Sequence, residues 1–195
     1  ERVIVTVPSD LEGGPAAVRI GGLPGETAYV SIGAVWATGL HQVDNPVFDS
    51  AGNLFVTYSG SRGQEAPVSI FRVTAGGSRE PFVSGIVNAT SMTVGPDNHL
   101  YVSSRFDGAV YKVASDGTYE QVASDLGVAC GVAFDADGWM YVGDRSGAIF
   151  RIRDGQAKAF ASIPASVAAF HLAMSPAGEL RSEEHTSELQ SRGLI

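Results

Sequence analysis

The stretch VAFDADGWMYVGDRSGAIFRI (132–152) decides the fold of this 195-residue chain. Its apolar runs are short and rich in β-branched and aromatic residues, and the turn segments DADG (135–138) and DRSG (144–147) separate them. No run reaches the length of about ten residues that a helix requires. Short runs bounded by Asp and Gly predict antiparallel strands joined by tight turns.

The first half of this stretch returns along the chain at a nearly fixed interval. The related segments are PVFDSAGNLFV (46–56), MTVGPDNHLYV (92–102) and LAMSPAGEL (172–180). The steps between them are 46, 40 and 40 residues, measured from Phe48 to Val94, Phe134 and Met174. Four short strands in a unit of about forty residues form a propeller blade. The sequence therefore predicts an all-β fold, an incomplete β-propeller with about three and a half four-stranded blades.

Residues 1–33 do not follow this repeat. The strand-like runs RVIVTVP (2–8), AAVRI (16–20) and TAYVSIG (27–33) are typical of the closing strands of an immunoglobulin-like sandwich. We therefore expect the end of an Ig-like domain at 1–33 and a partial propeller at 34–180. AVWATGLHQVD (34–44) aligns with EPFVSGIVNAT (80–90) and predicts a strand that completes the last blade of a closed ring.

The repeat stops at Leu180, where RSEEHTSELQS (181–191) begins. These residues match the translation of a widely used DNA sequencing adapter; the alternative is a genuine solvated tail. We expect 181–195 to be non-native and exclude it from functional reasoning. An open ring of this kind predicts an exposed strand edge and an exposed apolar blade face.

Composition narrows the class of protein. The chain is 44% hydrophobic and 17% charged, and its net charge of −8 argues against a nucleic-acid partner. No apolar run is long enough to span a membrane. The single cysteine, Cys130, excludes an internal disulfide and is expected to be a buried structural thiol.

A site is expected on one face of the propeller. Connections from second to third strands, and from fourth strands to the next blade, share that face, and pockets form where such loops converge. The Asp residues of the turns on the opposite face are expected to be turn formers. The candidate ligand-binding residues on this loop face are His41, Gln42, Asn88, Arg105, Asp144, Arg145 and His171, with Ser59 and Arg62 beside them.

Asp44 is the candidate metal ligand and catalytic residue. It precedes an innermost strand, where its carboxylate could bind a cation or act as a base. An Asx-type turn at Asp44-Asn45-Pro46 explains the same residues equally well. Arg105 and Arg145 recur at a forty-residue step, which favours an inter-blade pair with Asp144 or Asp107 over a paired anion site.

The first repeat carries six extra residues within TYSGSRGQEAPVS (57–69), the insertion loop. A tolerated surface insertion is the favoured interpretation, and a lid or specificity loop is the alternative.

The segment AFDADGWMYVGDRSGAIFRI (133–152) resembles the repeating phrase of the NHL-repeat and SMP-30/gluconolactonase superfamily, and the likeness covers about residues 34–180. The N-terminal part resembles the end of an IPT/TIG domain. The resemblance implies a TIG module followed by a six-bladed propeller in a bacterial protein, with a possible extracytoplasmic (periplasmic or secreted) location.

SMP-30-type lactonases bind one divalent cation, often calcium, through a Glu, an Asn and an Asp that also transfers protons. Asp44 matches that Asp. No Asn stands at a matching position; Asn88 lies two residues before Thr90, which occupies one of these positions. We therefore expect a non-catalytic propeller that binds a small-molecule, glycan or protein ligand on the loop face. The alternative is a divalent-cation-dependent lactonase that uses Asp44.

Overall fold

The structure of this chain, a computed structural model, describes residues 13–18, 27–33, 37–38, 40, 45–165 and 170–182. The regular structure of these residues consists of β-strands, without a helix. None of these residues therefore belongs to a helix long and apolar enough to cross a membrane. The chain divides into two compact units, Glu1–Gly39 and Leu40–Ile195, and each is described by itself.

The first unit contains an antiparallel hairpin of β1 (Gly14–Val18) and β2 (Ala28–Ile32). Its strands correspond to the predicted runs 16–20 and 27–33 within two residues. The third predicted run, 2–8, lies outside the described residues. The assignment of this unit to an Ig-like or IPT/TIG domain stays a prediction.

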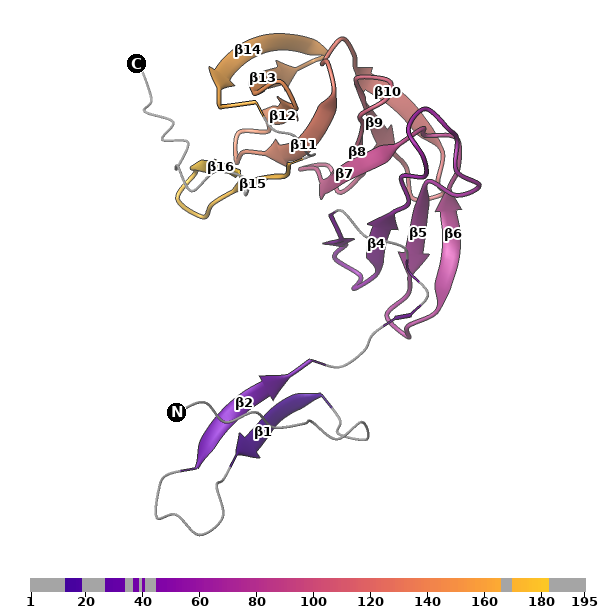
Figure 1. Ribbon diagram of the computed structural model, residues 1–195, viewed down its shortest axis with the longest axis vertical. Helices are drawn as coiled ribbons and strands as arrows, with labels where there is room; N and C mark the ends of the chain where they lie inside the picture. Colours follow the sequence, from indigo (N-terminus) through magenta and orange to yellow (C-terminus); the bar gives the residue numbers. More distant parts are fainter. Residues whose placement is uncertain are drawn as a thin grey trace. The chain divides into compact units, whose positions relative to one another are not determined.

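The second unit is an incomplete β-propeller made of successive antiparallel sheets, and in each sheet neighbouring strands are consecutive in the chain (Figure 1). Blade one comprises β3 (Val47–Phe48), β4 (Leu54–Thr57), β5 (Ile70–Val73) and β6 (Arg79–Val83). Blade two comprises β7 (Ala89–Val94), β8 (Leu100–Ser104), β9 (Ala109–Val113) and β10 (Tyr119–Ala123). Blade three comprises β11 (Ala129–Phe134), β12 (Met140–Asp144), β13 (Ala148–Arg153) and β14 (Gln156–Ser162). Blade four contributes β15 (Leu172–Met174) and β16 (Leu180–Ser182), which confirms the predicted fold.

The turn between the first two strands of each blade has the same geometry. In the first of them, the Asp49 carboxylate accepts hydrogen bonds from the main-chain N–H groups of Ala51 (2.9 Å) and Asn53 (2.8 Å). This pattern confirms that the turn aspartates shape the backbone. A positive φ recurs at the step of the sequence repeat, at Gly52 (80°), Asn98 (61°), Gly138 (80°) and Gly178 (80°).

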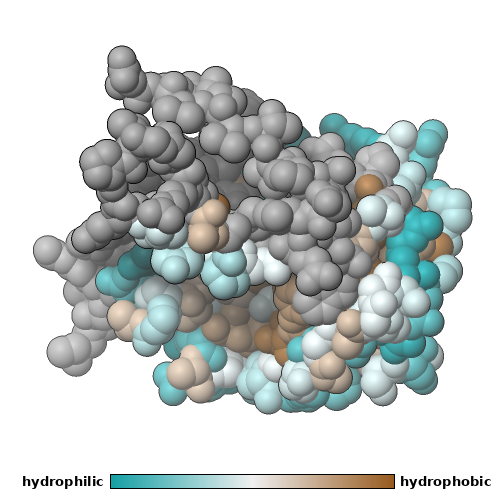
Figure 2. Space-filling model, turned by 90° about the horizontal axis from the view of Figure 1, so that it is seen from below, coloured by the Kyte–Doolittle hydropathy of each residue, from teal (hydrophilic) through white to brown (hydrophobic). Residues whose placement is uncertain are grey.

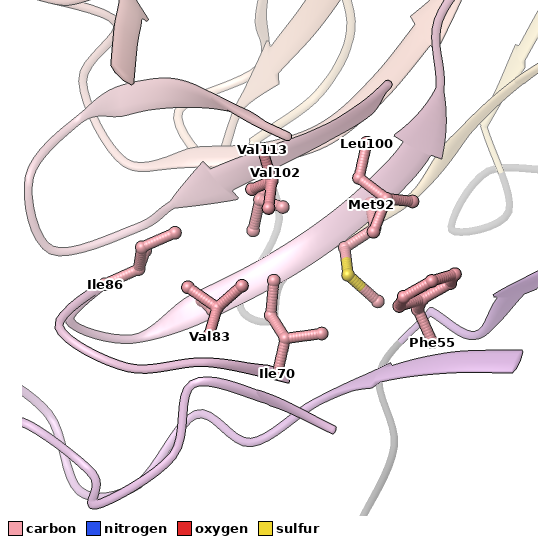
Figure 3. Close-up of a cluster of buried hydrophobic side chains, with 9 residues drawn as sticks. Phe55, Ile70, Val83, Ile86, Met92, Leu100, Val102 and Val113 are labelled. Carbon is pink, nitrogen blue, oxygen red and sulfur yellow. The ribbon is translucent and has the colours of Figure 1, made fainter. Parts of the chain in front are cut away.

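Apolar layers between neighbouring blades form the core. Between blades one and two, Phe55 and Ile70 face Met92 and Val102, and all four are at most 5% exposed (Figure 3). Equivalent layers join blade two to blade three and blade three to blade four. Burial of these side chains supplies the main stabilisation of the stack, about 1.5–3 kcal/mol for each large apolar side chain.

Hydroxyl groups also connect adjacent blades near the innermost strands. Thr57 Oγ1 donates to the main-chain oxygen of Thr90 at 3.4 Å, and Ser103 Oγ donates to that of Cys130. The two donors and the two acceptors occupy equivalent repeat positions. The repeat therefore carries polar contacts between blades as well as apolar layers.

One side of blade one has no described blade stacked against it. Val94 and Phe134 pack into the layers between blades, whereas the equivalent Phe48 is 53% exposed. Figure 2 shows brown hydrophobic residues gathered beside teal hydrophilic ones on one face of the molecule. This exposure is what an open ring predicts.

The structure tests two of the predicted boundaries only in part. The predicted closing strand at 34–44 lies largely outside the described residues. β16 continues to Ser182, which pairs with Leu172, so the strand extends two residues past the predicted end of the propeller at 180. Residues 183–195 lie outside the described part of the chain.

Candidate functional site

A cavity of about 330 Å³ opens on the loop face of the propeller. Second-to-third-strand connections of blades one to three contribute to it, and so do the connections that enter blades two and three. The sequence predicts that these two kinds of connection share a face, and the cavity shows that they do. Its lining residues are Arg62, Asn88, Arg105, Phe106, Gly127, Val128, Cys130 and Arg145.

The candidate residues from the sequence divide into three groups. Asn88, Arg105 and Arg145 line the cavity. Asp144 and His171 are not among its lining residues: the first lies behind Gly127, and the second directly precedes β15. Outside the described residues lie His41, Gln42 and Asp44.

Arg105 and Arg145 are held by the same main-chain contact in neighbouring blades. The N–H of Arg105 donates to the Asn88 oxygen at 3.3 Å, and that of Arg145 donates to the Val128 oxygen at 3.1 Å. Among the described residues, neither guanidinium group forms an ion pair or a side-chain hydrogen bond. The predicted inter-blade pair with Asp144 or Asp107 is therefore wrong within this part of the chain.

Asp144 stabilises the loops that carry the site. Its carboxylate accepts hydrogen bonds from the Val128 N–H at 2.7 Å and from the Ser146 hydroxyl, and the residue is 8% exposed. Gly127 packs against it so closely that an added Cβ would lie 2.7 Å from Asp144 Cγ. The carboxylate is thus committed to the main chain of the connection that enters blade three, which explains why it does not pair with an arginine.

Asn88 fixes the insertion loop at the rim of the cavity. Its side-chain amide donates to the main-chain oxygens of Ser59 (2.5 Å) and Ser61 (2.9 Å), and its Oδ1 accepts the N–H of Gly63 (2.7 Å). The residue is 1% exposed and has a φ of 50°. These bonds bracket Arg62 and bring it to the cavity, which supports the specificity-loop interpretation over a merely tolerated insertion.

Phe106 completes the rim and was not singled out in the sequence. Its ring lies against Gly63, where an added Cβ would meet Phe106 Cε2 at 2.9 Å, yet the residue is 55% exposed. A phenylalanine next to Arg105 in a turn that a propeller directs to the loop face was the available signal. Gly127 and Val128, which also line the cavity, have no distinctive side chains, so the sequence contained no signal for them.

Cys130 is buried beneath the cavity, with no measurable exposure. Its thiol donates to the Val128 oxygen at 3.1 Å. Burial raises the pKa of the thiol, and Asp144 adds to this, whereas a hydrogen bond with the main chain of Phe170 and the charges of Arg145 and Arg105 oppose it. The net rise keeps the thiol protonated at neutral pH, so this group adds no negative charge to the site.

The described residues do not fit a hard divalent cation. Among them, no three His, Cys, Asp or Glu side chains come together. The amide oxygen of Asn88 already accepts a hydrogen bond from Gly63, and the cavity presents guanidinium groups where a cation requires oxygen ligands.

Comparison with known proteins agrees with the fold. The family model "Strictosidine synthase-like, N-terminal" matches residues 131–152, which cover β12 and most of β11 and β13. No curated protein sequence matches the chain.

Solved structures similar to this chain are propellers with low sequence identity. A virginiamycin B lyase from Staphylococcus aureus is 15% identical with a TM-score of 0.60, covering 80% of this chain and 53% of its own. A putative gluconolactonase is 17% identical with a TM-score of 0.57, covering 80% and 60%. An auxiliary nutrient binding protein from Bacteroides thetaiotaomicron is 11% identical with a TM-score of 0.60, covering 72% and 35%. The chain thus spans between about a third and three fifths of the length of these proteins. The likeness establishes the propeller fold.

Proposed function

We propose that this protein is a ligand-binding propeller that holds a small molecule, without transforming it, in the cavity on the loop face. The observation that carries the proposal is the convergence of loops from three blades on one cavity lined by Arg62, Arg105 and Arg145. A volume of about 330 Å³ lies in the range of small-molecule sites.

The polar groups around the cavity favour binding over catalysis, because most of them are already engaged in hydrogen bonds to the main chain. The side chains of Asn88 and Asp144 are hydrogen-bonded to the main chain of the loops, and the Cys130 thiol is protonated and hydrogen-bonded to the main chain. A nucleophile or general base needs an available lone pair within reach of the substrate. The side chains that are not engaged are cations and an aromatic ring, which are groups that recognise ligands.

The fold by itself does not choose between binding and catalysis. The similar structures include a nutrient binding protein as well as a lyase and a putative gluconolactonase. One fold hosts many functions, so the residues of the cavity decide. A small molecule is favoured over the glycan or protein ligands that the sequence also allows, because the site is a cavity and not an extended surface.

A thermal-shift screen of a metabolite library on the full chain tests this proposal. A ligand present at a hundred times its Kd stabilises the folded state by about 2.7 kcal/mol. We expect a hit to slow amide hydrogen exchange at residues 105–106 and 127–130, which flank the cavity.

The alternative, a divalent-cation-dependent lactonase, makes an opposite prediction. Hydrolysis of aliphatic lactones that requires calcium, disappears in Asp44→Ala and survives in the charge-matched control Asp137→Ala would refute non-catalytic binding. Asp137 is an exposed residue of the turn on the opposite face, so the control removes a carboxylate without touching the loop face.

A further inference from the structure

We propose that the cavity recognises small organic oxyanions, carboxylates or phosphate esters, through Arg62, Arg105 and Arg145. This inference rests on the proposed function, because it specifies the chemistry of the ligand that the loop face binds.

Positive charge is concentrated at this cavity. The chain has a net charge of −8, with 13 Lys and Arg against 21 Asp and Glu. Three of these few cations line one cavity, and none of its lining residues is acidic. In an acidic protein, such a cluster creates a local field that attracts anions.

This positive charge is not neutralised by partners in the described part of the propeller. Across 45–165 and 170–182, none of the three guanidinium groups forms an ion pair or a side-chain hydrogen bond. Asp144, whose carboxylate lies against Gly127 of the cavity lining, accepts its hydrogen bonds from Val128 and Ser146. Because like charges repel, three arginines around one small space favour a bound anion.

The geometry of the lining side chains indicates the shape of the ligand. Arginine presents donors in a planar fork that matches the two oxygens of a carboxylate or phosphate. Phe106, 55% exposed at the rim, provides an apolar surface beside the guanidinium groups. The combination fits a molecule with an anionic end and a flat or apolar body rather than an inorganic ion alone.

A second, larger cavity provides the contrast. It measures about 530 Å³, and its charged lining residues are two cations, Lys112 and Arg153, and three carboxylates, Glu120, Asp137 and Asp154. Lys112 is paired with Asp97 at 2.7 Å. Its positive charges are balanced by acidic groups, so we do not expect it to bind anions.

Isothermal titration of the full chain with four probes tests the inference. The probes are benzoate, phenyl phosphate, inorganic phosphate and the neutral benzamide. We expect benzoate or phenyl phosphate to bind more tightly than benzamide, and the affinity to fall as salt concentration rises. The comparison of benzoate with phenyl phosphate separates the carboxylate from the phosphate source, and inorganic phosphate reports how much the apolar body contributes.

Charge-removing variants locate the binding. Arg105→Gln and Arg145→Gln should each weaken binding of the preferred anion by about tenfold or more, since each removes charge-assisted hydrogen bonds. Arg62→Gln changes an exposed side chain, so it should weaken binding without affecting folding. Arg153→Gln removes the same charge at the larger cavity and should leave the affinity unchanged.

Two outcomes would overturn the inference, and they are distinguishable. If benzamide binds as well as benzoate and the arginine variants keep their affinity while exchange protection stays at the cavity, the proposed function stands and the anion chemistry is wrong. If no probe binds, or if only Arg153→Gln loses affinity, the loop-face cavity is not an anion site.

Discussion

Replacement of Asn88 by alanine should destabilise the propeller and release the insertion loop. The change removes the three side-chain hydrogen bonds to Ser59, Ser61 and Gly63. A typical intramolecular hydrogen bond contributes about 0.5–1.5 kcal/mol net, so the three together contribute about 2–4 kcal/mol. The φ of 50° adds about 1 kcal/mol, because alanine tolerates the left-handed region poorly. We therefore expect a loss of about 3–5 kcal/mol in the free energy of unfolding.

Asn98→Ala is the matched control for the backbone contribution. Asn98 has a φ of 61° in an exposed turn, and within the described chain its side chain forms no hydrogen bond. Its replacement should cost only the conformational part, about 1 kcal/mol. Asn88→Gly makes the complementary test, since glycine accepts the positive φ and leaves only the hydrogen-bond loss.

Urea unfolding gives the free energies, and amide hydrogen exchange reports the loop. In Asn88→Ala, the Gly63 amide should exchange much faster, because its acceptor is gone. Equal destabilisation by Asn88→Ala and Asn98→Ala, with unchanged exchange at Gly63, would refute the conclusion that Asn88 anchors the insertion loop.

Three further changes test other parts of the structure. Gly143→Ala should lower the free energy of unfolding by about 1–3 kcal/mol through overpacking, because the new Cβ would lie 2.4 Å from the ring of Phe170. Gly76→Ala is the control: its new Cβ has its nearest contact at 3.8 Å, so urea unfolding should show almost no change. Burial alone would raise the pKa of Asp97, but hydrogen bonds, led by that from Lys112, lower it below the ordinary 3.8. Its contribution is therefore present above the unfolded pKa and lost as pH falls through the folded value, so Lys112→Met should flatten the fall in Tm between about pH 5 and pH 2; an unchanged acid limb would contradict this. Cys130 should resist iodoacetamide at neutral pH in the native chain and react in urea, as followed by mass spectrometry, since its thiol is buried with a raised pKa; rapid native labelling would show that the thiol is accessible.

The blades could be predicted from the sequence because the features that define them are local. The step from Phe48 to Val94 and Phe134 reports stacking layers, and the turn glycines at 52 and 138 report positive φ at equivalent points. Such features need only neighbours within a hairpin or the next blade. The loop face followed from the same topology, without knowledge of any side-chain contact.

The use of individual polar side chains could not be predicted, because it depends on partners far along the chain. Asn88 bonds residues 25 to 29 positions earlier, in the one loop that breaks the repeat. The recurrence of Arg105 and Arg145 indicated equivalent positions correctly, but it did not reveal that Asp144 would bind the main chain of Val128 instead. Periodicity shows where a residue stands, whereas the bonding partner depends on three-dimensional loop geometry.

The separation of scaffold from site explains how blade one can differ from its neighbours. Arg105 and Arg145 stand at equivalent positions, but blade one has Ser59 there, whose hydroxyl donates to the Ala89 oxygen at 2.5 Å. Blade one instead supplies Arg62 from its insertion loop. The apolar layers and the turns of the opposite face lie apart from these loops, so the third arginine is gained without altering the core. Two guanidinium groups related by the repeat and one outside it make the cavity asymmetric, and an asymmetric cation cluster fixes one orientation of a bound anion.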